Sequence, residues 1–140
     1  MITSADAFKR FGDPKVEKGM VLTKIPDNLQ FGPVPEHVYC NQALVYPLMQ
    51  ALNNIVDRKL TAQVQTWDGC FCIRSKRGAL SRSLHSWGLA IDINAATNVF
   101  GNKPTMPLTL VKCFTDAGFD WGGRWQKPDG MHFQLSKFTS

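Results

Sequence analysis

The chain has 140 residues, 44% of them hydrophobic, and a formal net charge of +5. This length supports one hydrophobic core, so we expect a single domain over residues 1–140. The sequence has no run of about 18 apolar residues, no basic-then-apolar N-terminal segment and no nucleic-acid motif, so we expect no membrane span, secretory signal or nucleic-acid partner. Eleven glycines, eight prolines and only 19% charged residues favour a loop-rich α+β fold over a helical bundle.

The N-terminal half is predicted to contain two helices. Residues 3–12 indicate a short helix with a threonine cap at its start and a glycine at its end. Residues 13–39 are rich in proline, so we expect them to be mostly irregular, with one short strand at 20–25. A longer helix is predicted over residues 41–58, because leucine and isoleucine recur there at helical spacing.

The middle of the chain is predicted to form a hairpin followed by a basic loop. Residues 60–67 alternate as a strand, residues 68–69 make an Asp-Gly turn, and residues 70–73 indicate a second strand. The loop at 74–82 carries four basic side chains, which favour an anionic partner or act only in solubility.

The last third is predicted to contain a short helix and a turn. Residues 107–117 begin with proline and end before glycine, as helices do, and residues 119–125 indicate an aromatic, glycine-rich turn. Without an export signal, the four cysteines of the chain are expected to be reduced.

Two stretches alternate cleanly between apolar and polar residues, as half-buried strands do. Within residues 88–94 the leucine and isoleucines face one side and Asp92 faces the other. Within residues 131–135 the apolar side chains again share one face, and His132 and Gln134 face away from it. Each strand thus carries, opposite its apolar face, a residue of a type that can bind a metal ion: Asp92 on the first and His132 on the second.

His85, Asp92 and His132 therefore form a candidate zinc site across neighbouring strands. His85 lies where the chain enters the first strand, so its ring can converge with the carboxylate of Asp92, and His132 supplies a ligand from the second strand. Imidazole and carboxylate ligands suit zinc, and three protein ligands leave a fourth position for water, as in catalytic zinc sites. A single histidine or aspartate in a strand more often has a structural role than a metal-binding one. The zinc site is favoured because both strands place these residues opposite their apolar faces.

Asp129 is the candidate general base. A zinc ion lowers the pKa of its water to about 7, and amide hydrolysis also needs a group that takes the proton of the water and passes it to the leaving amine. Asp129 lies three residues before His132, just ahead of its strand, and Gly130 lets the backbone turn between them. A plain turn is the alternative explanation for Asp129.

Two motifs carry these residues in a fixed order: Ser83-x-His85-x-x-Gly88-x-Ala90-x-Asp92, and Asp129-x-x-His132-Phe133. This pair resembles the VanY-type D-alanyl-D-alanine carboxypeptidase and L-alanyl-D-glutamate peptidase family of zinc peptidases, which shares its core with lysostaphin-type enzymes and the hedgehog signalling domain. The resemblance runs over about residues 67–135. It implies a small antiparallel sheet flanked by helices, one zinc ion per chain and cleavage of peptidoglycan stem peptides. By position, the two histidines and Asp92 match the ligands and Asp129 the base.

The resemblance also implies an arginine that holds a carboxylate or carbonyl of the substrate. Arg74 matches this arginine best, although an aromatic residue usually precedes it and Arg77 and Arg82 lie close by. The planar fork of arginine suits a carboxylate better than lysine would.

Ser83 and Trp125 are further candidate substrate contacts. Ser83 opens the first motif, although a turn residue in this place needs no other role. Trp125, like Trp87 and Trp121, is a candidate for a wall of the cleft, and core packing explains each tryptophan equally well.

An aspartate in the base position resembles the endolysin-type L-alanyl-D-glutamate endopeptidases of this family, whereas glutamate is more usual in its D-alanyl-D-alanine enzymes. We therefore predict a phage endolysin, a monomer with no stable membrane insertion and no separate cell-wall-binding domain. We expect it to be made in the host cytoplasm without a signal peptide and to reach the peptidoglycan after holin-type release. A D,D-carboxypeptidase, a non-catalytic zinc-containing binding module and a virion-associated role are the alternatives.

Overall fold

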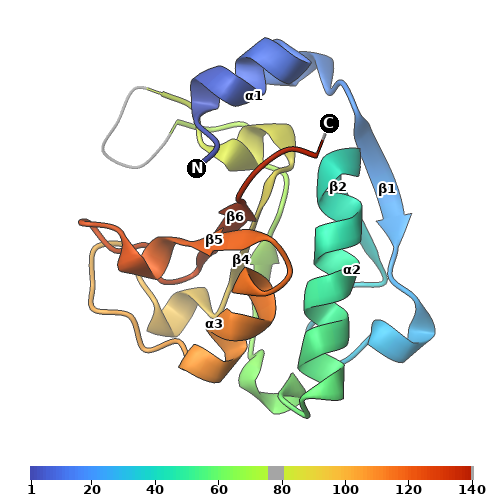
Figure 1. Ribbon diagram of the computed structural model, residues 1–140, viewed down its shortest axis with the longest axis vertical. Coiled ribbons are helices and arrows are strands. Elements are labelled where there is room, and N and C mark those ends of the chain that lie inside the picture. The colour runs from blue at the N-terminus through green and yellow to red at the C-terminus, as the bar shows by residue number, and fades with distance from the viewer. Residues whose placement is uncertain (76–80, 140) are drawn as a thin grey trace.

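The computed structural model describes residues 1–75 and 81–139, and over these residues it is an α+β fold (Figure 1). The described strands form two antiparallel sheets, which three α-helices flank. The smaller sheet pairs β1 (Met20–Lys24) with β2 (His37–Asn41). The predicted fold class is thus confirmed.

The larger sheet has the strand order β3-β4-β6-β5, and all of its neighbours are antiparallel. At its centre, Ile91 and Phe133 face each other across β4 and β6 and are fully buried. Phe133 stacks on Phe114 with a ring separation of 4.2 Å, which joins this sheet to the helical layer. The four strands are β3 (Trp67–Gly69), β4 (Ala90–Ile93), β5 (Phe119–Trp121) and β6 (His132–Leu135).

The helices begin and end where local sequence chemistry predicts. Thr3 forms a capping box with Asp6, so that each side chain accepts a hydrogen bond from the backbone N–H of the other. Asn41 caps the second helix through a 3.0 Å bond from the N–H of Ala43 to its Oδ1. None of the described helices is both long and apolar enough to cross a membrane. The three are α1 (Ser4–Phe11), α2 (Gln42–Asp57) and α3 (Leu108–Thr115).

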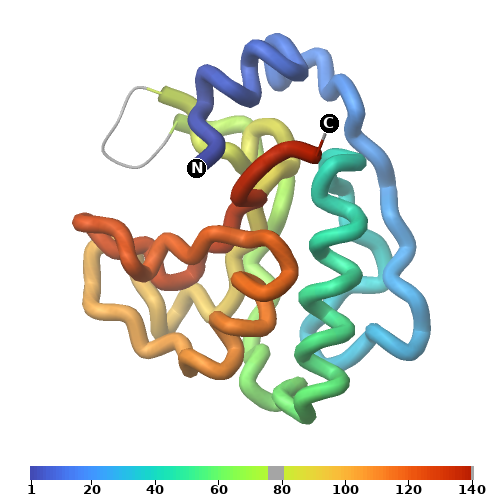
Figure 2. The backbone as a smooth tube through the Cα atoms, in the orientation of Figure 1, coloured from blue at the N-terminus to red at the C-terminus, as the bar shows by residue number. Residues whose placement is uncertain are grey.

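Helix α2 contacts both strands of the smaller sheet, β1 and β2, and also packs against α3. The N-terminal segment before α1 lies near the end of the chain, and Figure 2 shows both termini on the same side of the molecule. A hydrogen bond from the Gln134 side chain on β6 to the carbonyl of Ile2 fixes this proximity.

The predicted hairpin at residues 60–73 is wrong. Residues 61–63 form a 3-10 turn, the strand β3 covers the Asp-Gly pair that was expected to turn, and residues 70–73 lie in no strand. At residues 63–66 the buried side chain of Asn94 takes the place of a partner strand: its Oδ1 accepts hydrogen bonds from the N–H groups of Gln65 and Thr66, and its amide donates to the carbonyl of Gln63. The side chain of Asn94 thus makes the hydrogen bonds that the backbone of a neighbouring strand would make in a regular hairpin.

Two strands are absent from the sequence predictions. β2 lies in the segment that was expected to be irregular, and β5 lies where only a turn was expected. β5 has three residues and pairs only through β6, so its short pattern carries too little periodicity to be recognised.

Gly88 is a position where the fold requires glycine. Its φ is +67°, and a Cβ there would lie 2.7 Å from the backbone nitrogen of Asn41. The same residue joins the two sheets, because its carbonyl accepts the N–H of Asn41.

We expect Gly88→Ala to lower the free energy of unfolding by about 2–3 kcal/mol, because left-handed strain adds to a backbone clash. Chemical denaturation measures this loss. Gly32→Ala is the matched control, since its φ is also positive, at +46°, but its Cβ would meet nothing nearer than 3.8 Å. Equal losses in the two variants would contradict the clash at Gly88.

Candidate functional site

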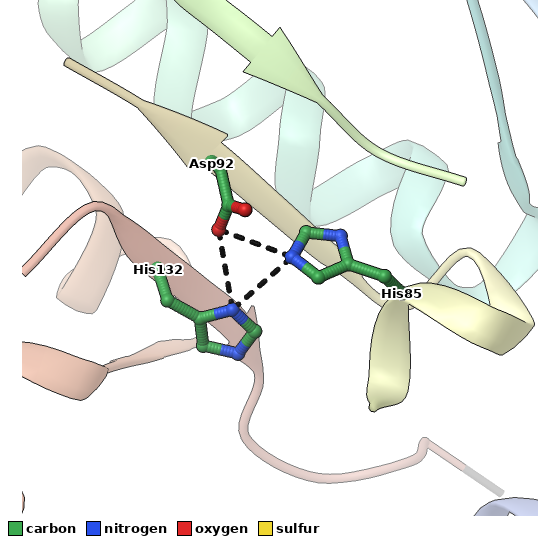
Figure 3. Close-up of side chains that lie close together, drawn as sticks. All are labelled: His85, Asp92 and His132. Atoms are coloured by element: carbon green, nitrogen blue, oxygen red, sulfur yellow. Dashed lines mark hydrogen bonds and ion pairs between the residues drawn. The ribbon is translucent and has the colours of Figure 1, made fainter. Parts of the chain in front are cut away.

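His85, Asp92 and His132 come together in the structure (Figure 3). Asp92 and His132 are direct partners in the register of β4 and β6, so their side chains leave the sheet side by side. His85 lies in the 3-10 turn Leu84–Trp87, which leads into β4. All three are buried, at 2%, 7% and 4% exposure. The structure thus brings together the three ligands predicted from sequence.

The spacing of their ligand atoms fits a metal ion. Nε2 of His85 lies 3.0 Å from Oδ1 of Asp92, and Nδ1 of His132 lies 3.3 Å from that oxygen and 3.2 Å from the His85 nitrogen. Ligand atoms about 2.0–2.1 Å from a tetrahedral zinc ion are roughly 3.3 Å apart, which is close to each edge of this triangle.

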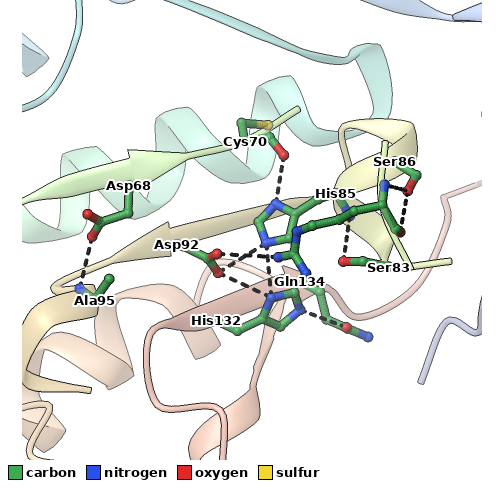
Figure 4. A network of polar contacts seen from close by, with 10 residues as sticks. Asp68, Cys70, Ser83, His85, Ser86, Asp92, Ala95, His132 and Gln134 are labelled. Atoms are coloured by element: carbon green, nitrogen blue, oxygen red, sulfur yellow. Dashed lines mark hydrogen bonds and ion pairs between the residues drawn. The ribbon is translucent and has the colours of Figure 1, made fainter. Parts of the chain in front are cut away.

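The outer nitrogens of both histidines face hydrogen-bond acceptors (Figure 4). Nδ1 of His85 lies 2.7 Å from the carbonyl of Cys70, and Nε2 of His132 lies 3.0 Å from Oε1 of Gln134. Each ring thus has a hydrogen-bond partner on the side that faces away from the other two residues, as metal-binding histidines commonly do. Neither acceptor was singled out from the sequence, although the pattern put Gln134 on the same face as His132.

The carboxylate of Asp92 and the ring of His132 shift each other's pKa. Burial alone would raise the pKa of Asp92, but the hydrogen bonds and positive charge of His132 and His85 hold it well below its ordinary value. Burial by itself would lower the pKa of His132, but the hydrogen bond and charge of Asp92, with a further contribution from Asp129, raise it. A buried positive charge is therefore favoured beside Asp92.

Arg74 lies at the edge of this centre. Its Nη2 is 3.7 Å from Oδ2 of Asp92, whereas both histidines contact Oδ1 of the same carboxylate. The buried hydroxyl of Ser86 fixes the Arg74 backbone by accepting its N–H and donating to its carbonyl, each at 3.1 Å. Of the two alternative arginines, Arg77 lies outside the described residues, and Arg82 is not among the residues that line the cleft.

A cleft of about 380 Å³ opens beside His132, which is the member of the candidate metal centre that lines it. Ser83 contributes to its wall and also caps the 3-10 turn, because its Oγ accepts the N–H of His85. The ring of Trp125 also lines the cleft, 5.4 Å from that of His132. The cleft is lined by residues from both halves of the chain: Met1, Ile2, Thr3, Arg74, Ser83, Leu84, Phe100, Trp125, Gln126, Lys127, Asp129, His132 and Gln134.

The other two tryptophans are packing residues. Trp87 donates its indole N–H to the carbonyl of Gly12, and Trp121 donates to the carbonyl of Gly130. Both are nearly fully buried, at 4% and 8% exposure, and neither lines the cleft. Of Trp87, Trp121 and Trp125, only Trp125 lines the cleft.

Asp129 lies in the cleft with His132. Its backbone is held on both sides, because its N–H donates to the carbonyl of Gly122 and its carbonyl accepts the N–H of His132. Its Oδ1 is buried. A Cβ at Gly122 would lie 2.6 Å from the Asp129 carbonyl oxygen, so only glycine allows this close approach. The backbone of Asp129 is thus held next to the strand that carries His132.

The segment that contains His85, Asp92, Asp129 and His132 matches a known protein family. Residues 77–135 match the family model described as D-alanyl-D-alanine carboxypeptidase. The predicted family resemblance is confirmed over these residues. This matched segment includes all three residues of the candidate metal centre and Asp129, whereas Arg74 lies outside it.

One solved structure is similar to the chain. The L-Ala D-Glu endopeptidase ChiX of Serratia marcescens is 22% identical in sequence, with a TM-score of 0.47, over 69% of this chain and 80% of that one. None of the curated proteins compared with the chain matches it significantly.

The opposite pKa shifts predict how the stability of the metal-free protein depends on pH. The lowered pKa of Asp92 stabilises the fold above its unfolded value of about 3.9, and this stabilisation is lost as the pH falls. The raised pKa of His132 stabilises the fold fully below about 6.5 and is lost as the pH rises through the raised value. We expect the melting temperature in chelator to be higher at about pH 5.5 than at about pH 8.5.

The control for this prediction is Asp92→Asn, which removes the charge responsible for the shift in His132. Its melting temperature should fall less between the two pH values. Added zinc should also reduce the alkaline loss in the unmodified protein, because the metal replaces the proton. An equally steep fall in Asp92→Asn would contradict the assignment to this pair.

Proposed function

We propose that the protein is a zinc-dependent peptidase that hydrolyses the stem peptide of peptidoglycan. The observation that carries the proposal is the convergence of His85, Asp92 and His132 on one point beside a cleft that also contains Asp129. Two imidazoles and one carboxylate suit zinc better than magnesium or calcium, which prefer oxygen ligands. The family match over residues 77–135 supports a peptidase with a peptidoglycan substrate.

The residues of the cleft have distinct tasks in this reaction. When bound, zinc supplies a Lewis acid that polarises the scissile carbonyl and lowers the pKa of a water molecule. Asp129 takes a proton from the attacking water and delivers it to the leaving amine. Arg74, whose guanidinium borders both Asp92 and the cleft, holds a carbonyl or carboxylate of the substrate. Trp125 and Ser83 line the substrate's path.

The bond between L-alanine and D-glutamate is the one we propose to be cut. The support is the aspartate at the base position, which resembles the endopeptidases of the family. A phage endolysin released through a holin-opened membrane is the corresponding biological role, and the net charge of +5 suits an anionic wall polymer. The description of the matching family model favours the second candidate, a D-alanyl-D-alanine carboxypeptidase with the same zinc chemistry.

Digestion of purified peptidoglycan distinguishes the two candidates. We expect mass spectrometry of the products to reveal free L-alanine ends on the muramic acid side and peptides that begin with D-glutamate. Loss of only the terminal D-alanine would exclude the endopeptidase and favour the carboxypeptidase. Zinc removal by a chelator should abolish either product pattern, and zinc added back should restore it.

Replacement of the base separates an enzyme from a zinc-containing binding module. We expect Asp129→Asn to lower kcat by roughly 10²–10⁴-fold, because the variant cannot accept the proton of the water. Its zinc content should stay at one ion per chain, since Asp129 is not one of the three ligand residues. Asp57→Asn, which removes the same charge at the exposed end of α2, is the control and should keep full activity.

Full hydrolytic activity in Asp129→Asn would exclude Asp129 as the base. A wild-type protein that binds zinc and peptidoglycan but releases no product would instead support the binding module. The two results are distinct, because the first leaves hydrolysis intact and the second lacks it from the start.

A further inference from the structure

A buried chain of hydrogen bonds runs from the N-terminal segment to the metal centre. Nε2 of Gln134 donates to the carbonyl of Ile2 at 3.4 Å, and Oε1 of Gln134 lies 3.0 Å from Nε2 of His132. The three residues are 5%, 6% and 4% exposed, so water has little access to either contact. Since His132 and Gln134 are two residues apart on β6, their side chains leave the same face of the strand.

The Ile2 carbonyl, at one end of this series of hydrogen bonds, determines the direction of each of them. The Ile2 carbonyl can only accept, so the NH₂ group of the Gln134 amide must face it. The amide oxygen therefore faces His132, and it too can only accept. Nε2 of His132 must then carry the proton, which leaves the lone pair of the neutral ring on Nδ1. That nitrogen is the one that points to Asp92 and His85.

We infer that Gln134 is a positioning residue that selects the tautomer of His132 needed to bind the metal. The inference rests on the proposed function only in that it assumes a metal at the centre. It adds a residue outside the ligand set and assigns the backbone of the N-terminal segment a part in the site. Gln134 acts through His132 and does not touch the metal.

The selection matters because the ring has a competing arrangement. Nδ1 of His132 lies 3.3 Å from Oδ1 of Asp92, so a proton on Nδ1 would make a charge-assisted hydrogen bond there. That tautomer has no lone pair on Nδ1 and cannot bind the metal through it. Gln134 opposes this arrangement by offering an acceptor to Nε2, and its loss would leave the competing tautomer favoured.

The N-terminal segment is held firmly enough to serve as the anchor. Thr3, next to Ile2, forms the capping box of α1 with Asp6. The hydroxyl of Ser4 donates to the carbonyl of Arg82 at 2.8 Å, which ties the start of α1 to the segment that leads into the 3-10 turn of His85. The position of the Ile2 carbonyl thus depends on α1 and not on a free chain end.

Two substitutions test the inference. Gln134→Met keeps the size of the side chain but removes the acceptor, and we expect it to weaken zinc binding by roughly 10–100-fold in a chelator competition. Gln134→Glu keeps an acceptor for Nε2, and we expect it to retain zinc affinity within about tenfold of wild type. Gln50→Met is the control, because the side chain of Gln50 donates to Asn54 within α2, away from the metal centre, and its loss should leave zinc affinity unchanged.

The nitrogen chemical shifts of the His132 ring give a readout that a merely structural role would not move. In metal-free protein at alkaline pH, we expect the proton on Nε2 in the wild type and in Gln134→Glu, and on Nδ1 in a large fraction of Gln134→Met. A proton on Nδ1 in the wild type would overturn the inference without any variant. So would wild-type zinc affinity in Gln134→Met, or an equal loss of affinity in folded Gln134→Met and Gln134→Glu.

These outcomes are separable from failure of the proposed function. Zinc affinity and the ring tautomer are measured without substrate, so a protein with no peptidase activity still tests Gln134. Conversely, an active peptidase whose Gln134→Met variant behaves as wild type would retain the function and lose the inference.

Discussion

The constraint at the centre of this structure is that three acceptor atoms converge on one buried point. The outer nitrogens of His85 and His132 face the Cys70 carbonyl and the Gln134 amide oxygen, so the inner lone pairs of the neutral rings point at the carboxylate of Asp92. Three lone pairs about 3.0–3.3 Å apart repel one another unless a positive charge lies between them. A proton supplies that charge in the metal-free protein, and a bound divalent cation would supply it more fully.

The sheet makes this unfavourable arrangement possible. Asp92 and His132 are partners in the β4–β6 register, and their neighbours Ile91 and Phe133 are fully buried on the opposite face. A slip of one residue in either strand would exchange its two faces, turning Asp92 or His132 into the apolar core and Ile91 or Phe133 toward the site. Core packing therefore fixes the positions of the two side chains. The hydrophobic pattern therefore specifies the candidate metal centre indirectly, since the energy that holds Asp92 and His132 side by side comes from the apolar side of the strands.

The alternation of apolar and polar residues also explains which features the sequence could predict. Strict alternation around Asp92 and His132 was enough to place both residues on one face, and the caps at Thr3 and Asn41 located two helices. The acceptors behind the histidines were not predictable, because one is a backbone carbonyl and the other is a glutamine whose role depends on Ile2, 132 residues away. Contacts of that separation leave no periodic trace in a single sequence.

The wrong prediction of a strand at residues 70–73 has its physical explanation in the site. In a regular strand beside β4, the Cys70 carbonyl would be available to the ladder, but in the structure it accepts the Nδ1–H of His85. Gly69, with φ at +127°, and the register shift between β3 and β4 take the chain out of the ladder just before Cys70. The loss of regular pairing there supplies the acceptor that His85 needs, much as the buried glutamine supplies one for His132. Both histidines are therefore oriented by groups outside the motif that carries them, and a graft of the motif alone onto another sheet would lack the tautomers that the metal requires.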